Sequence, residues 1–71
     1  MYRIYRASDI TSVDTRSQFV TMKLESDGRL VCVGTGSSPE QIRRDTYLGR
    51  LGHTMNDKDG REYIELFSGE Q

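Results

Sequence analysis

The feature that most constrains the fold is an Asp27-Gly28 pair set between two runs of β-prone residues. From residue 20 to residue 25, apolar and polar residues alternate, which is the period-two pattern of a strand with one buried face. An Asp-Gly pair is typical of a two-residue type I′ turn, in which both central residues have positive φ. The pattern therefore predicts an antiparallel hairpin over residues 18–33.

This turn also predicts which residues of the hairpin face each other. A two-residue loop pairs Leu24 with Val31 and Met22 with Val33, so these four apolar side chains share one face. Three further apolar residues are then left on the opposite face: Phe19, Leu30 and Cys32. We expect a loop or a neighbouring chain to cover them.

A helix is predicted after the hairpin. Ser38 is suited to the N-cap and Pro39 to the first helical position. Gln41, three residues after Ser38, completes a capping box. Glycines weaken the later turns, so we expect two to three turns that end or kink between Leu48 and Gly52.

Two more strands are predicted near the ends of the chain, over residues 2–7 and 61–67. Residues 8–18 indicate a polar connecting loop in which Ile10 and Val13 turn inward. The order β-β-β-α-β indicates an α+β fold: a small, mostly antiparallel sheet of about four strands with one short helix packed on one face.

The chain is too short for more than one domain, and we treat residues 1–71 as a single unit. Leu, Ile, Val and Phe together number 15 of 71 residues, which predicts a thin core. The net charge of −1 does not force the chain open. A binding partner or a second copy would help to stabilise so small a domain.

Several classes of protein do not fit the composition. The single cysteine, Cys32, makes no internal disulfide, which is typical of a reducing compartment. One His and one Cys do not make a closed zinc site, so we expect no structural metal and no cofactor. The sequence has neither a charged-then-apolar leader nor an apolar run of about 20 residues, so we expect a cytoplasmic protein outside the membrane.

Two glycine-containing motifs resemble ligand-binding loops without completing them. Gly34-Thr35-Gly36 begins like a phosphate-binding loop, but Pro39 takes the place of its third glycine. Residues 57–60, Asp-Lys-Asp-Gly, resemble the middle of a calcium loop, yet Met55 and Leu66 fall at its first and last ligand positions. We interpret the first motif as the end of a strand and the second as a turn.

Catalysis is not expected. Cys32 and His53 are the one pair that suggests a nucleophile and its base, and nothing in the sequence brings them together. Glu62 and Glu65 are three residues apart on a predicted strand, so their carboxylates point to opposite faces. We therefore predict that the chain is not an enzyme.

The charges are unevenly distributed, which suits a protein-binding surface. Residues 41–56 carry three arginines against one aspartate, whereas residues 57–71 carry five acidic against two basic residues. Such polarity steers a partner, and Arg and Tyr dominate binding hot spots. The predicted contact residues are Tyr5, Arg43, Arg44, Tyr47 and Arg50.

We therefore expect a stand-alone module that binds another protein as an inhibitor or adaptor. Short, motif-free, near-neutral chains are frequent among accessory proteins of phages and mobile elements, including those that act against host defences. A second hypothesis is a single-stranded nucleic-acid-binding protein that stacks bases on Tyr2 and Tyr5, with the arginines on phosphates. A third is a homodimer that forms through a sheet edge or through Phe19 and Leu30.

Overall fold

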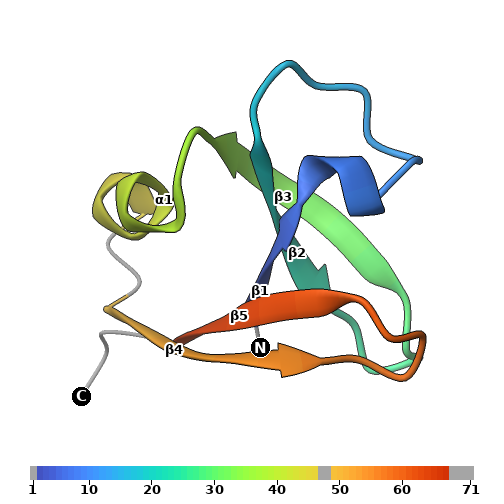
Figure 1. Ribbon diagram of the computed structural model, residues 1–71. Coiled ribbons are helices and arrows are strands. Elements are labelled where there is room, and N and C mark those ends of the chain that lie inside the picture. Colours follow the sequence, from blue (N-terminus) through green and yellow to red (C-terminus); the bar gives the residue numbers. More distant parts are fainter. Residues whose placement is uncertain (1, 47–48, 68–71) are drawn as a thin grey trace.

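The computed structural model describes residues 2–46 and 49–67, and within them every paired strand is antiparallel to its neighbours (Figure 1). The five strands form one sheet in the order β3-β2-β1-β5-β4. Their bounds are β1 (Tyr2–Arg6), β2 (Phe19–Leu24), β3 (Leu30–Gly36), β4 (Arg50–Asn56) and β5 (Glu62–Phe67). A 3-10 turn η1 (Ala7–Asp9) follows β1, and the helix α1 (Pro39–Thr46) connects β3 to β4. The α+β class and the single helix on one face are confirmed.

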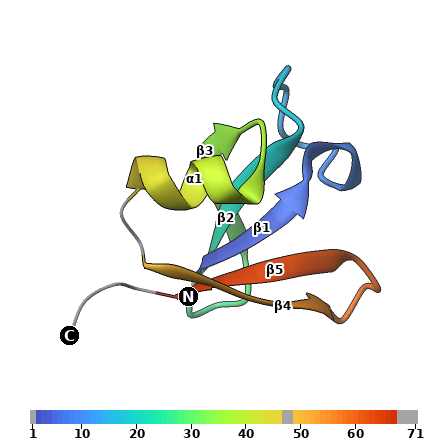
Figure 2. The same cartoon turned by 60° about the vertical axis from the view of Figure 1, so that its left-hand side comes forward.

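The central strand β1 is buried on both faces. We call the side covered by α1 the helix face, and the side covered by residues 7–18 the loop face; Figure 2 shows the two coverings on opposite sides of the sheet. Ile4 points to the helix face and Tyr5 to the loop face. Two small hydrophobic clusters thus replace one large core, as suits a chain with few apolar residues.

On the helix face, Ile42 of α1 packs against Ile4 and Leu66, and all three are buried. Gly36 at the end of β3 permits this approach, because a Cβ there would lie 2.5 Å from Cγ1 of Ile42. The glycine thus lets the helix close onto the sheet. Its predicted role at the end of a strand is confirmed.

The loop face is covered by the segment that was predicted as a connecting loop. Ile10 is buried in the cluster and Val13 packs against it. The remaining buried members come from three strands and are Tyr5, Val20, Met22 and Tyr63. The loop is therefore part of the core, and the prediction that its two apolar residues turn inward is confirmed.

The helix begins where the sequence predicts. The backbone N–H of Gln41 donates to Oγ of Ser38 at 3.1 Å, which is the expected N-cap. The side chain of Gln41 reaches one residue further back than a capping box does, since its Oε1 accepts the N–H of Ser37 at 2.8 Å. The described helix runs to Thr46, and Gly49 is no longer helical; Leu48, the earliest end that was expected, lies outside the described residues.

Strand β4 was not predicted. Its sequence, from Arg50 to Asn56, contains His53 and Gly52 and shows no regular apolar alternation. The pairing with β5 is itself irregular, with a register shift between Leu51 and Thr54. A bulge of this kind removes the period-two signal, which explains why pattern analysis missed the strand.

The hairpin over β2 and β3 exists, but its predicted register is wrong. The N–H of Gly28 donates to the carbonyl of Glu25 at 3.0 Å, and Glu25 N–H donates to the carbonyl of Arg29 at 2.8 Å. The loop therefore has three residues, with Gly28 at φ 91°, rather than a two-residue type I′ turn. As a result Leu24 pairs with Leu30, and Met22 pairs with Cys32.

The shift of one residue changes which side chains are buried. Val31 and Val33, expected in the core, are 37% and 51% exposed. Leu30, expected on the uncovered face, packs against the loop-face cluster instead. Phe19 packs against the helix-face cluster.

The turn between β4 and β5 has the same construction. Asp57 N–H donates to the carbonyl of Arg61 at 2.9 Å, and Gly60 N–H donates to the carbonyl of Asp57 at 3.0 Å. Gly60 has φ 82°, a left-handed conformation like that of Gly28. Both turns follow one local pattern, an acidic residue, any residue, then Asp-Gly-Arg. The prediction that residues 57–60 form a turn is confirmed.

Candidate functional site

Strand β3 is an edge of the sheet, with β2 on one side and no strand of the described residues on the other. Its seven residues, Leu30–Gly36, include no charged side chain and no proline. Edge strands of monomeric proteins are usually protected by such residues, because their free main-chain groups can pair with another chain. A bulge at Val33, where the register shifts, is the one protective device on this strand.

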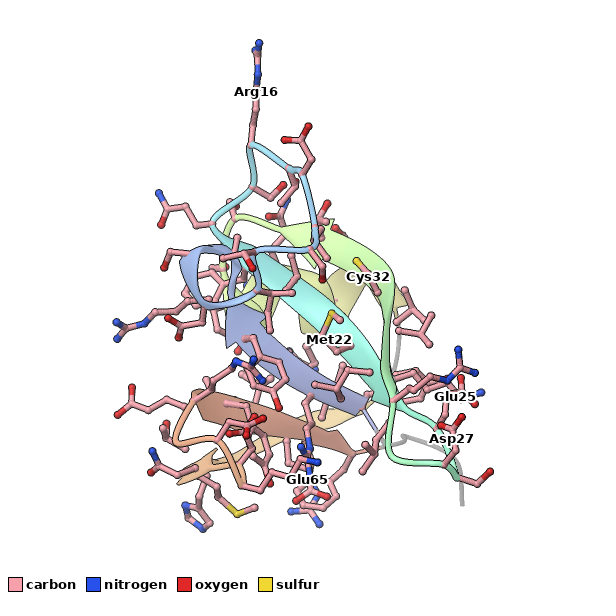
Figure 3. The ribbon with its side chains drawn as sticks, turned by 90° about the vertical axis from the view of Figure 1, so that its right-hand side faces the viewer. Arg16, Met22, Glu25, Asp27, Cys32 and Glu65 are labelled. Atoms are coloured by element: carbon pink, nitrogen blue, oxygen red, sulfur yellow. The ribbon has the colours of Figure 1, made fainter. Side chains whose placement is uncertain are left out.

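Three consecutive exposed side chains of β3 form the first candidate surface, which we call the β3 edge: Val31, Cys32 and Val33. Cys32 is labelled in Figure 3, on the strand that borders this side of the molecule. Its thiol lies 3.6 Å from the carbonyl oxygen of Gly34. The β3 edge is thus apolar, uncharged and accessible.

The main chain of β3 has free hydrogen-bonding groups at defined positions. The bond between Glu25 and Arg29 fixes the alternation of the antiparallel ladder. From this bond, the Lys23–Val31 pair is hydrogen-bonded, and the N–H and C=O groups of Leu30 and Cys32 point away from β2. These are the groups that an added strand would meet.

The predicted arginines lie on and after α1, and not all are equally available. Nε of Arg43 donates to Oε2 of Glu40 at 2.8 Å, and its Nη1 donates to the carbonyl of Gly49 at 3.0 Å. Arg43 therefore braces the end of the helix, while Arg44 is exposed. Arg50, also exposed, places its guanidinium 4.8 Å from the ring centre of Phe67.

Tyr5, one of the two tyrosines of the predicted contact set, is not part of this surface. Tyr5 has an exposed fraction of 0%, because β1 is the central strand and its loop face is covered. The expectation that Tyr5 contacts a partner is therefore wrong, and its ring is not available to stack on a base. Tyr47 lies outside the described residues.

Tyr5 instead belongs to a buried polar network that sequence reasoning missed. Nη1 of Arg3 donates to the Tyr5 hydroxyl at 3.1 Å, and this hydroxyl donates to Oδ2 of Asp57 at 2.9 Å. The guanidinium of Arg3 lies 4.3 Å from the ring centre of Tyr63, a cation–π contact. The network links β1 to the β4–β5 turn across the loop face.

The environment fixes the protonation states in this network. Burial raises the pKa of Tyr5 above its ordinary value of 10.0, so the hydroxyl keeps its proton and remains a donor. Burial acts against the charged form of Asp57, but hydrogen bonds from Arg61 N–H, the Tyr5 hydroxyl and Asp59 N–H hold its pKa below 3.8. Burial also opposes the charge on Arg3, yet its hydrogen bond to Tyr5 and its electrostatic contacts with Tyr5, Tyr63 and Asp57 raise its pKa above the ordinary value.

An open groove of about 570 Å³ lies beside this network on the loop face. Figure 3 views this side of the molecule, with Met22 on the sheet and Asp27 in the β2–β3 turn. Residues of both hairpin turns line the groove, including Gly28 and Lys58, and Arg3 contributes from β1. We call this the two-turn groove.

The predicted sulfur and imidazole groups are separated by the fold. Cys32 is on β3 and His53 is on β4, which are the two outermost strands. They therefore do not form a nucleophile–base pair. In residues 2–46 and 49–67, no cluster of three or more His, Cys, Asp or Glu residues is arranged to hold a metal ion. No helix in the same part of the chain is long and apolar enough to cross a membrane.

Comparison of the chain with protein-family models, with curated proteins and with solved structures gives no match. Function must therefore be argued from the surface itself. The one sequence signal that would have located the two-turn groove is the repeated Asp-Gly-Arg at residues 27–29 and 59–61.

Proposed function

We propose that the chain is a protein-binding module, an inhibitor or adaptor, that takes up an extended segment of its partner along the β3 edge. The observation that supports this most is the exposure of Val31 and Val33, at 37% and 51%, on an outer strand without charges. An added strand gains affinity from main-chain hydrogen bonds and specificity from its alternate side chains.

The free main-chain groups suit such pairing. Leu30 and Cys32 direct their N–H and C=O groups outward, so a partner strand would bond at both positions. The side chains of Val31, Cys32 and Val33 are small and leave room for a partner strand to approach. Burying the two valines would stabilise the complex by about 25 cal/mol for each Å² of apolar area removed from water. No charge on β3 needs to be desolvated.

Arg44 supplies the second part of the proposal. It is exposed on α1, and α1 packs against β3. A positive side chain at the rim of an interface accelerates association with an acidic partner and makes it sensitive to salt. We therefore expect Arg44→Glu to slow association, whereas Arg43→Glu also disturbs the end of the helix, where Arg43 binds the carbonyl of Gly49.

The experiment compares two substitutions of the same kind on the two edges of the sheet. Val33→Lys changes the β3 edge, and Met55→Lys changes β4, where Met55 is 39% exposed. Each tagged protein is used for affinity capture from host lysate, with and without nuclease. Thermal unfolding confirms that both variants remain folded.

The expected result is a stoichiometric protein partner that survives nuclease, is retained by Met55→Lys and is lost with Val33→Lys. Equal retention by both variants would contradict the β3 edge as the binding surface. Loss of every partner on nuclease treatment would overturn the proposal in favour of nucleic-acid binding. If capture recovers only the chain itself and light scattering shows a dimer, the proposal of a foreign partner is overturned, and a second copy of the chain is the partner instead.

A further inference from the structure

We infer that the two-turn groove binds a small organic oxyanion, a carboxylate or phosphate attached to an apolar or aromatic group. This site is separate from the β3 edge, so either inference can fail without the other. Its volume of about 570 Å³ falls within the range of small-molecule sites.

The positive charge of the groove comes first from Arg3. Its Nη1 is bound to the neutral Tyr5 hydroxyl, and its Nε is buried without any hydrogen-bond partner. None of the ion pairs in the described part of the chain includes Arg3, although Glu65 stands opposite it in the sheet register. Because Nε is closed off from solvent, an oxyanion in the groove would meet the terminal nitrogens Nη1 and Nη2, which form a planar fork suited to it.

The acidic residues of the groove are already engaged. Asp57 accepts the Tyr5 hydroxyl and the N–H groups of Asp59 and Arg61, each at 2.9 Å. Asp59 is paired with Arg61 at 3.3 Å. Lys58, in contrast, is exposed and takes part in no ion pair of residues 2–46 and 49–67. Arg3, Lys58 and Arg61 bring three positive charges to the groove, against two negative charges on Asp57 and Asp59, so its net charge is +1. Both carboxylates share Arg61, at 3.6 and 3.3 Å, which leaves Arg3 and Lys58 as the lining cations outside the ion pairs of the described residues.

The opposite wall of the groove is apolar. Leu24 and Leu30 line it from the β2–β3 hairpin, and Ile10 lines it from the loop that follows η1. At Gly28 there is no atom within 4 Å of a Cβ position, so the wall is open at the turn. A ligand that places an anionic group near Arg3 would lay its apolar part against this wall, which is why a bare inorganic ion is a poorer fit.

The test uses phenyl phosphate as the probe and follows backbone amide shifts of the ¹⁵N-labelled protein by NMR. Phenol and inorganic phosphate are titrated in parallel, so that the anionic and the apolar parts are measured separately. Saturable shifts confined to residues around the groove, with phenyl phosphate binding more tightly than either part, are the expected result. Phenol or inorganic phosphate binding as tightly would overturn the inferred ligand class.

Two variants of equal charge distinguish the site from general attraction to a cation. Lys58→Gln removes a charge at the groove, and Arg16→Gln removes one from an exposed loop position that points away from the body (Figure 3). Lys58→Gln should weaken binding about two- to fivefold at low salt, and Arg16→Gln should leave it unchanged. Arg3→Lys keeps the charge but removes the fork, and should weaken binding about tenfold.

Equal weakening by Lys58→Gln and Arg16→Gln would overturn the site, because binding would then depend on net charge alone. The absence of saturable shifts at high probe concentration would also overturn it. The spectrum of each variant without probe shows whether its fold is intact. Lys58 and Arg16 are both exposed, so these two variants keep the test informative even if Arg3→Lys unfolds.

Discussion

Replacing Asp57 with alanine should destabilise the protein far more than the same change at Glu25, its counterpart in the other turn. The side chain of Asp57 is only 4% exposed and accepts three hydrogen bonds at 2.9 Å. Glu25 occupies the equivalent position, yet none of the side-chain hydrogen bonds found in residues 2–46 and 49–67 involves its carboxylate. The pair separates the effect of the buried network from the effect of altering a turn.

The magnitude follows from the partners that Asp57→Ala leaves behind. The Tyr5 hydroxyl would remain buried without its acceptor, at a cost of about 1–3 kcal/mol. Two turn N–H groups would lose a charged acceptor but regain water. We expect a loss of about 2–4 kcal/mol in the free energy of unfolding, against about 0.5 kcal/mol or less for Glu25→Ala. Domains of this size have a total of about 4–11 kcal/mol.

Urea denaturation followed by far-UV circular dichroism measures both variants. Tyr5→Phe provides an internal check, because it removes the same hydroxyl bond from the other side. The double variant Tyr5→Phe/Asp57→Ala should then lose little more than Asp57→Ala alone. Equal losses for Asp57→Ala and Glu25→Ala, or strict additivity with Tyr5→Phe, would refute the network.

The remaining predictions concern acid, packing and the thiol. Because the pKa of Asp57 is lower in the folded than in the unfolded state, the stability it contributes is present above pH 3.8 and is lost as pH falls through the folded value. In a series of urea melts at decreasing pH, the free energy of unfolding should therefore fall less steeply for Asp57→Ala than for the unmodified protein. Gly36→Ala should lower stability by about 1–3 kcal/mol, because its Cβ would lie 2.5 Å from Ile42; an unchanged melting temperature would contradict this packing. Cys32 is exposed and should react with a thiol reagent without unfolding, whereas reaction at the unfolding rate would place it in the interior.

The sequence was most informative where local chemistry decides structure. The start of α1 depends on Ser38 and Pro39, which act within one turn of the helix, and it was predicted to the residue. The hairpin turn also depends on local chemistry, but Asp-Gly fits both a two-residue and a three-residue loop. Choosing between the two required knowing that Leu30, rather than Val31, meets the core.

The candidate sites were less predictable because they depend on contacts far apart in the sequence. Tyr5 and Asp57 are 52 residues apart, and their bond forms only when β5 pairs with β1. Tyr5 was predicted as a contact residue from its residue type, whereas the central strand β1 is covered on both faces and buries it. The β3 edge became visible only with the strand order, since pairing the terminal strands leaves β3 on the outside.

The most direct test of β3 as the binding edge is amide hydrogen exchange at single-residue resolution, with and without the captured partner. In the free protein the Cys32 amide, which points outward, should exchange rapidly, while the Val31 amide is protected by β2. With the partner bound, the Cys32 amide should become protected and the amides of β4 should be unchanged. Protection that appears elsewhere and leaves Cys32 exchanging at its free rate would contradict the account.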